Sequence, residues 1–160
     1  MMVKDYHKNI IKIIEELASK KQHLKINPLN RQLKIEHTYK VEGFFYNPDI
    51  YFVNTKNNKY LIFEILDSQK KDKTIADICR IIFFKKCYKA IFVVKTDEQK
   101  EDIELIVDTI KVIFHDMIYE LLGEKKIKEL DKEKIIRLVC LVINDKASSK
   151  KIKNELNKLF

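Results

Sequence analysis

The sequence predicts an α/β fold in which a mixed four-stranded sheet is flanked by helices on both faces. The chain has 160 residues, 46% of them hydrophobic and 35% charged, a globular composition long enough for one domain with a core. Only two glycines and two prolines occur, so long regular elements are expected. Amphipathic segments and apolar runs follow the order α-β-β-β-α-β over residues 1–95. A helical extension, residues 96–160, is expected to pack on that core.

The first helix is predicted over about residues 4–24, because apolar residues recur there at helical spacings of three, four and seven. These residues are Tyr6, Ile10, Ile13, Ile14, Leu17 and Leu24. The stretch "NPLNRQ" then breaks the helix. From Gln32 to Val41, polar and apolar residues alternate strictly, which predicts a half-buried strand.

Two further strands, "DIYFV" and "KYLIFEIL", are joined by the polar turn "NTKNN", whose length suits a hairpin. A charged loop, "DSQKKDK", leads into a second helix over about residues 73–88. The buried side of this helix is expected to consist of Ile75, Ile78, Cys79, Ile82 and Phe83, with Cys87 as a further candidate. The apolar run "AIFVV" (90–94) is typical of an interior strand, and the helix before it allows a parallel crossover.

Thr96 is the expected N-cap of a third helix, and acidic residues fill its first turns, where the helix dipole favours negative charge. This helix is predicted to end at Gly123. Two shorter helices are predicted near residues 131–144 and 149–159. The pair has three interpretations: a helix-turn-helix that binds the DNA major groove, a cover for the core, or a homodimer contact.

The net charge of +8 is concentrated in the first part of the chain. Residues 1–95 hold 19 Lys and Arg against 10 Asp and Glu, a net charge of +9, whereas residues 96–160 hold 13 against 14, a net charge of −1. A basic first part indicates a polyanionic partner, with DNA as the expected nucleic acid. A lysine-rich solvated surface without such a partner is the alternative interpretation.

A cytoplasmic location is expected from three features of the sequence. No apolar stretch approaches the roughly 18 to 20 residues of a membrane span, so no membrane partner is expected. The N-terminal "MMVKDYHKNI" lacks the hydrophobic region of a signal peptide. The three cysteines, Cys79, Cys87 and Cys140, are widely spaced and odd in number, which suits a reducing compartment.

Two carboxylates interrupt the apolar strands: Asp49 opens one strand, and Glu64 lies inside the next. A carboxylate in a strand that is buried on both faces is costly, so its presence needs a reason. Acids on neighbouring strands can converge on one divalent cation, because Mg²⁺ commonly takes one or two carboxylates together with water and substrate phosphate. The backbone carbonyl of Ile65 is a further candidate ligand. Mg²⁺ or Mn²⁺ in such a site activates water for phosphodiester cleavage.

This pattern resembles the PD-(D/E)xK nucleases, the restriction-endonuclease-like superfamily, over about residues 4–95. The resemblance rests on the α-β-β-β-α-β order, on "PD" at Pro48-Asp49 and on "FEI" at Phe63-Glu64-Ile65. It implies the restriction-endonuclease-like fold and a metal-dependent deoxyribonuclease activity. It also implies that Asp49 and Glu64 are the two metal-binding acids.

The lysine of the family motif is missing from its usual place, two residues beyond the second acid, where this chain has Leu66. Some branches of the superfamily carry the basic residue on the following helix, and Lys73 and Arg80 lie there in this sequence. Arg80 does not give up its proton but can clamp a phosphate, whereas Lys73 can do either. Lys73 is therefore the favoured replacement.

The family resemblance also implies an acid upstream of the motif, for which Glu15, Glu16 and Glu36 are candidates. Ordinary solvated charge is the alternative for each of them. Phosphate contacts are expected from basic residues beside the proposed site and on the first strand, and such contacts add affinity without reading sequence. These basic residues are Arg31, Lys34, Lys40, Lys70, Lys71 and Lys73.

Three functions stay open on the sequence alone. The first is a metal-dependent nuclease that hydrolyses DNA. The second is a catalytically inactive protein of the same fold that binds nucleic acid or acts in assembly. The third is a protein-interaction module with no nucleic-acid role, whose basic charge is compositional. Leu66 favours the second function, whereas the retention of both acids favours the first. The structural alternatives are a turn residue at Asp49 and an ion pair at Glu64.

Overall fold

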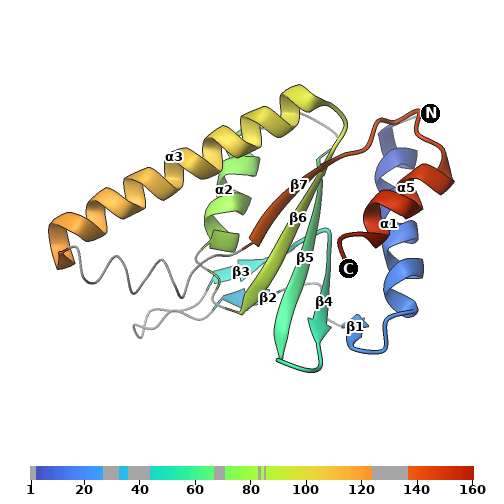
Figure 1. The fold of residues 1–160 in the computed structure, drawn as a ribbon, viewed down its shortest axis with the longest axis horizontal. Coiled ribbons are helices and arrows are strands. Elements are labelled where there is room, and N and C mark those ends of the chain that lie inside the picture. The colour runs from blue at the N-terminus through green and yellow to red at the C-terminus, as the bar shows by residue number, and fades with distance from the viewer. Residues whose placement is uncertain are drawn as a thin grey trace.

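The computed structural model of the protein describes residues 3–26, 33–35, 44–66, 71–82, 84, 86–123 and 137–160 (Figure 1). Its helices are α1 (Val3–Ser19), α2 (Lys71–Ile82), α3 (Asp97–Leu122) and α5 (Ser149–Asn157). Its strands are β1 (Leu24–Ile26), β2 (Leu33–Ile35), β3 (Phe44–Tyr46), β4 (Ile50–Asn54), β5 (Lys59–Leu66), β6 (Cys87–Val94) and β7 (Arg137–Val142). The predicted α/β fold, a mixed sheet flanked by helices, is confirmed for these residues.

Five strands form the main sheet, in the order β1-β4-β5-β6-β7, instead of the predicted four. β4 is antiparallel to β1 and β5, whereas β6 is parallel to β5 and β7. The β4–β5 connection is a tight polar turn in which Asn58 has a φ of 54°, a left-handed conformation that asparagine tolerates. α2 lies between β5 and β6 in the chain, as a parallel crossover requires.

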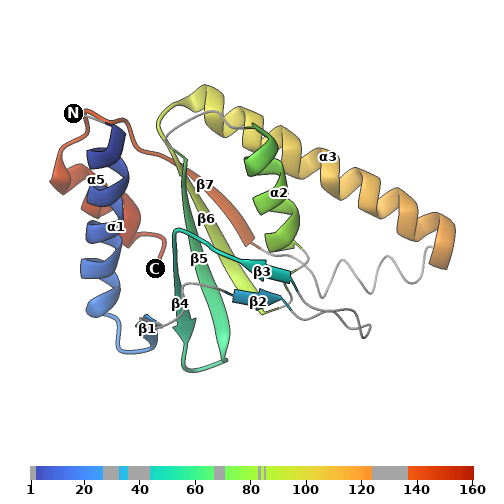
Figure 2. The same ribbon diagram turned by 180° about the vertical axis from the view of Figure 1, so that it is seen from behind.

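Helices cover both faces of the main sheet, α1 and α5 on one face and α2 and α3 on the other (Figures 1 and 2). Side chains alternate along β5, so Phe63 and Ile65 pack in the layer under α1 and α5, whereas Ile62 packs in the layer under α2 and α3. The same alternation places Glu64 on the α2 side. β5 and most of β6 are buried on both faces, as near-continuous apolar runs predict.

The strand predicted to begin the sheet lies elsewhere. β2 pairs with β3 in a separate two-stranded sheet, and β1 takes the edge beside β4 instead. α1 ends at Ser19, earlier than predicted, because the chain turns there: the N–H of Lys21 donates to the carbonyl of Ala18, and the N–H of Leu24 to that of Lys21. The remainder of the predicted strand, residues 36–41, lies outside the described residues.

The helix predicted near residues 131–144 is wrong over residues 137–142, which form β7. This run, "RLVCLV", is apolar and partly β-branched, and periodicity alone does not separate a short buried strand from a helical segment. Each of its residues pairs with β6, and this pairing decides the outcome. The helix-turn-helix interpretation of the tail is therefore wrong, whereas α5 confirms the last predicted helix.

α2 is shorter than predicted and presents a different face to the sheet. It ends at Ile82, and Cys87 and Tyr88, which were expected to extend it, open β6. The buried residues of its described part are Thr74, Asp77, Ile78 and Ile81. Ile75, expected in the core, is 41% exposed, because it lies outside that face of the helix. The core side of α2 therefore carries a carboxylate, Asp77, among its apolar residues.

α3 begins and ends as predicted. Thr96 Oγ1 accepts from the N–H of Gln99 at 3.2 Å, and Gln99 Oε1 accepts from the N–H of Thr96 at 3.2 Å, which together form a capping box. Gly123 follows the last helical residue with a φ of 78°, the left-handed conformation that glycine adopts without strain. Neither α3 nor any other described helix carries an apolar stretch of the length that crossing a bilayer requires.

Candidate functional site

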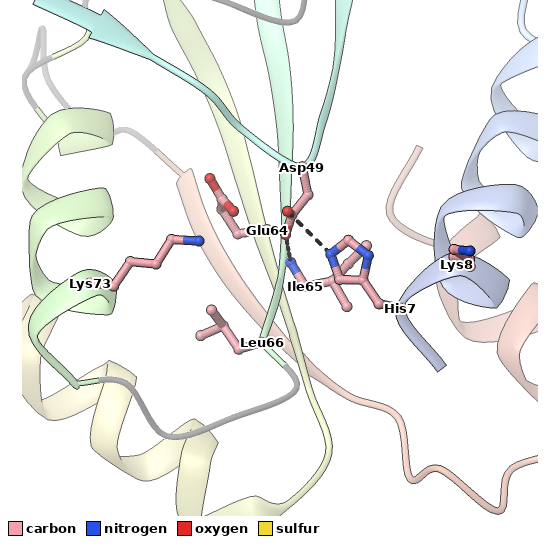
Figure 3. A pocket seen from close by; sticks show the side chains of 7 residues that line it. All are labelled: His7, Lys8, Asp49, Glu64, Ile65, Leu66 and Lys73. Carbon is pink, nitrogen blue, oxygen red and sulfur yellow. Dashed lines mark hydrogen bonds and ion pairs between the residues drawn. The ribbon is translucent and has the colours of Figure 1, made fainter. Parts of the chain in front are cut away.

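A pocket of about 450 Å³ lies between α1 and α2, where β4 begins and β5 ends (Figure 3). Its lining residues come from α1, β5, α2 and the residue before β4: His7, Lys8, Asp49, Glu64, Ile65, Leu66 and Lys73. Acidic side chains lie in its interior, and basic side chains reach it from the two helices. The structure therefore brings Asp49, Glu64, Ile65 and Lys73, all predicted site residues, to one pocket.

Asp49 continues the hydrogen bonding between β4 and β5 with its side chain. The two strands pair as far as Ile50 and Phe63, and Asp49 lies just beyond the last pair. Its Oδ2 accepts from the backbone N–H of Ile65 at 2.7 Å. Because the N–H and C=O of one strand residue face the same neighbour, the carbonyl of Ile65 also faces the Asp49 side. The strand geometry thus explains why Asp49 and the Ile65 backbone meet.

The second oxygen of Asp49 faces α1. Asp49 Oδ1 lies 3.2 Å from Nε2 of His7, and both side chains are partly exposed, 29% for His7 and 21% for Asp49. Sequence reasoning missed His7, because it lies on an amphipathic helix at no metal-ligand spacing from the other histidines. Only the three-dimensional position of α1 at the start of β4 reveals the contact. His7 fixes the orientation of the Asp49 carboxylate at the mouth of the pocket.

Glu64 lies in the central strand β5, opposite Phe92 of β6, and is only 3% exposed. Its carboxylate points out of the strand toward α2 and into the pocket (Figure 3). Burial disfavours the charged form of a carboxylate, so nearby cations or donors must offset this cost. Glu64 and Asp49 both line the pocket, Glu64 from within β5 and Asp49 from the residue before β4.

Leu66 and Lys73 both line the pocket beside Glu64, Leu66 from β5 and Lys73 from α2. Leu66 is two residues beyond Glu64 and on the same side of β5, and it packs against the core under α2 and α3. The ammonium of Lys73 extends from α2 across the pocket toward Glu64 (Figure 3). A cation therefore reaches the acids from a helix, at a place where the strand itself offers an apolar side chain.

Arg80, the other predicted candidate, does not line this pocket. Its Nη1 donates to Oδ1 of Asp77 at 2.9 Å, an i,i+3 pair on α2. Asp77 is 2% exposed, and burial raises the pKa of its carboxyl, while Lys73 and Arg80 lower it and Asp49 raises it further. Asp77 lies one helical turn after Lys73 on α2, and this places it near the pocket.

Asp77 is a second residue that sequence reasoning missed. In "KTIADICR" it reads as one polar residue of a solvated helix face. The only indication in the sequence that Asp77 lies near Lys73 is its position four residues later, next to Ile78, which is buried in the structure.

Glu16, a predicted candidate for the upstream acid, lies away from the pocket. It lines no part of the pocket and pairs instead with Lys153 of α5 at 2.9 Å and with Lys20 at 3.8 Å. The hydrogen bond from Lys153 lowers the pKa of its carboxyl. Its role is to join α1 to α5.

The predicted phosphate-binding residues are described only in part. Lys71 pairs with Asp102 of α3 at 3.6 Å, and its side chain is 64% exposed. Arg31, Glu36, Lys40 and Lys70 lie outside the described residues, and of Lys34 the structure describes the backbone in β2. Lys8 is a basic pocket residue that the sequence did not single out.

The protein groups that fit a divalent cation are the carboxylates of Asp49 and Glu64 and the carbonyl of Ile65. All are hard oxygen donors, and Mg²⁺ usually completes such a set with water and substrate phosphate. Within the described ranges, no three His, Cys, Asp or Glu side chains are grouped closely enough to hold a metal ion by themselves. A cation bound by these groups would have to take its remaining ligands from outside the described protein side chains.

Comparisons of this chain with protein-family models, with curated proteins and with solved structures find no match.

Proposed function

We propose that this protein is a metal-dependent nuclease that hydrolyses DNA phosphodiester bonds. The observation that carries the proposal is the convergence on one pocket of Asp49, Glu64 and Lys73, from the start of β4, from β5 and from α2. Two carboxylates with an adjacent ammonium are the groups that metal-assisted attack of water on a phosphodiester needs. The resemblance to the PD-(D/E)xK nucleases gives the same residues the same roles.

Asp49, Glu64 and the Ile65 carbonyl are the groups that would hold Mg²⁺ or Mn²⁺. When bound there, the metal supplies a Lewis acid that activates water and stabilises charge on the phosphate. Lys73 orients the attacking water or the phosphate from the α2 side, in place of a lysine at position 66. His7 and the Ile65 N–H hold the Asp49 carboxylate in one orientation, so its geometry is fixed before the substrate arrives.

The arrangement of elements around the pocket supports a restriction-endonuclease-like fold. α1, the main-sheet strands β1, β4 and β5, α2 and the parallel strand β6 follow the α-β-β-β-α-β order that the resemblance implies. β7 extends this unit at the edge beside β6. We infer that the described main sheet is a variant of that fold with one additional edge strand.

DNA is the proposed partner because of charge. Residues 1–95, which contain the whole pocket, hold 19 Lys and Arg against 10 Asp and Glu. Lys8 and Lys73 flank the acids from the two sides of the pocket, so a phosphate backbone can cross it between them. The three cysteines, free in the described residues, suit the cytoplasm as the place of action.

A second function, nucleic-acid binding without catalysis, is favoured by one observation. Leu66 removes the family lysine, and both Asp49 oxygens are already engaged by groups of the chain itself. In that case the fold and basic surface serve binding or assembly, and the acid pair is a remnant.

A cleavage assay separates the two functions. The protein is incubated with single-stranded, duplex and branched DNA, in Mn²⁺, in Mg²⁺ and in chelator. We expect metal-dependent cleavage of at least one substrate, abolished by chelator. Binding of DNA in chelator and in metal, without cleavage in any condition, would establish the second function instead.

A further inference from the structure

β7 forms one edge of the main sheet, next to β6 (Figure 1). The N–H of Ile143 donates to the carbonyl of Val94 at 2.7 Å, so the backbone groups of Ile143, and of every second residue before it, face β6. The N–H and C=O groups of Leu138, Cys140 and Val142 therefore face away from the sheet. Among the described residues, these outward groups have no backbone hydrogen-bond partner.

β7 lacks the features that usually protect a free strand edge. Such an edge pairs readily with another chain, and proteins blunt it with short strands, charges, prolines or bulges. The opposite edge strand, β1, is protected in this way: it has three residues, and the exposed Lys25 is the central one. β7 has six residues, pairs with β6 without a register shift, and carries no charge or proline from Leu138 to Ile143. These features are typical of a strand that pairs on both sides.

The open edge of β7 is complementary to itself. In an antiparallel pair, directly opposed residues can exchange two N–H···O=C hydrogen bonds. When Cys140 lies opposite Cys140 of a second copy, Leu138 lies opposite Val142 on each side, and all the outward groups of these residues are paired. In this register Arg137, the first residue of β7, lies near the segment that follows β7 in the other copy, where the first charged residue is Asp145. Opposite charges thus meet at both ends of the pair.

α3 adds apolar surface beside this edge. Its Ile106 and Ile110 pack in the same core layer as side chains of β7. Seven large apolar side chains of the described residues are exposed, and five of these lie on α3: Leu105, Val112, Ile113, Met117 and Leu121. A two-fold axis that pairs the two β7 edges places the second α3 on the same face of the joined sheet. Stable interfaces bury about 1,200–2,000 Å² in total, more than two short strand edges provide, and α3 can provide the rest.

We propose that β7 binds β7 of a second copy of this chain, in an antiparallel pair centred on Cys140 that joins the two main sheets into one. The interface is isologous, so both copies use the same groups and the assembly closes as a dimer. This contact differs from the helix pair that the sequence offers as a homodimer contact. It does not depend on the proposed nuclease function.

The mass in solution tests the dimer. Wild type, Cys140→Pro and the control Ile26→Pro are measured by size-exclusion chromatography with light scattering at about 100 µM chain, above the Kd of even a weak specific interface. Cys140→Pro removes one outward N–H and keeps the hydrogen bonds to β6. We expect twice the 19.2 kDa chain mass for wild type and a single chain mass for folded Cys140→Pro.

Ile26→Pro is the matched control because it removes an outward N–H from the other edge strand. The carbonyl of His23 accepts from the N–H of Thr55 at 2.8 Å, so by alternation the backbone of Ile26 faces away from β4. This variant should stay dimeric. A wild type that is monomeric, or a folded Cys140→Pro that stays dimeric, would overturn the proposal.

Amide hydrogen exchange in the wild type, followed by NMR, tests the same contact without a substitution. The N–H groups of Leu138, Cys140 and Val142 lack a backbone partner among the described residues, so pairing with another strand is needed to slow their exchange. We expect them to exchange as slowly as those of Val139 and Leu141, which face β6. If Cys140→Pro does not fold, this measurement decides. A dimer in which the three outward amides exchange much faster than those of Val139 and Leu141 contradicts the pairing of β7.

Discussion

The acids in the pocket, Asp49 and Glu64, and the nearby Asp77 are held in different ways, and each way has a cause in the backbone. Asp49 lies where β4 begins and is fixed by a strand N–H and by His7. Glu64 is buried in the central strand, at 3% exposure. Asp77 is buried on a helix and only partly satisfied. One partly solvated acid beside two buried ones is an arrangement that costs stability and is typical of functional sites.

The displaced-lysine account predicts a rescue. Lys73→Ala should lower the cleavage rate about 100-fold, because the ammonium that orients water or phosphate is lost. Adding Leu66→Lys in that background should recover about tenfold or more, since position 66 shares the Glu64 side of β5. The control is Leu66→Met with Lys73→Ala, which keeps an apolar side chain and should recover nothing. Equal rates for the two double variants would contradict a role for a cation at this place.

Asp77 gives the protein a pH dependence whose sign follows from burial. Burial raises the pKa of its carboxyl above the usual 3.8, so the folded state binds a proton more tightly than the unfolded state. The stability from that proton is present below about pH 4 and is lost as the pH rises through the folded pKa. As the pH rises from about 4 to 7, the Tm of the wild type should therefore fall relative to the Tm of Asp77→Asn. Asp72→Asn is the control. A difference in Tm between wild type and Asp77→Asn that stays constant over this pH range would contradict the predicted effect of Asp77.

At the scale of elements, the C-terminal segment closes the α1 side of the sheet. Ile152 and Leu156 of α5 are buried, and the ring of Phe160 packs against those of Phe52 and Phe63. Glu16 and Lys153 join α5 to α1 at the surface. The segment after β7 is thus part of the core that supports α1, and α1 carries His7 to the pocket.

Leu156→Ala should destabilise the protein by about 2–5 kcal/mol, because it empties a fully buried site. The free energy of unfolding in urea measures this loss. Lys153→Ala on the same helix is the control and should have little effect, since its ion pair with Glu16 is exposed. If Leu156→Ala were as stable as wild type, α5 would not be part of the core.

The sequence was informative for elements whose signals are local. The capping box at Thr96 and Gln99 and the glycine at position 123 mark the two ends of α3. The alternation of side chains along β5 places Glu64 and Phe63 on opposite faces of the sheet. β1 and β7 were missed because their positions depend on pairing with strands that are distant in sequence. The same limit applies to the site: Asp49 and Glu64 stand out in apolar runs, whereas His7 and Asp77 gain meaning only when helices meet the sheet.

At the scale of the whole molecule, the excess of basic residues lies in the part of the sequence that forms the pocket. The basic first part of the chain contributes the pocket, and the near-neutral second part contributes α3, β7 and α5. A ligand with many phosphates would be drawn to the first part over distances of about 10 Å at moderate salt.

DNA binding should therefore weaken steeply with salt, because neutralised phosphates release counterions. Charge reversal of Lys8 and Lys73 at the pocket should reduce both the affinity and the slope of log K against log salt. In the matched control, the charges of Lys150 and Lys151, two exposed lysines of α5, are reversed. This change should have little effect on the affinity or on the salt slope. Fluorescence anisotropy with labelled DNA measures both. Equal losses in the two double variants would show that the pocket does not direct binding.

Asp49 and Glu64 are proposed to share one divalent cation, and titration with Mn²⁺ measures whether they do. Bound Mn²⁺ is followed by the loss of its free-ion paramagnetic resonance signal in wild type, Asp49→Asn, Glu64→Gln and Glu16→Gln. We predict one Mn²⁺ per chain in wild type and in Glu16→Gln, whose exposed acid pairs with Lys153, and an affinity about 100-fold weaker in each of the other two. Wild-type affinity in a folded Glu64→Gln or Asp49→Asn variant would contradict the claim.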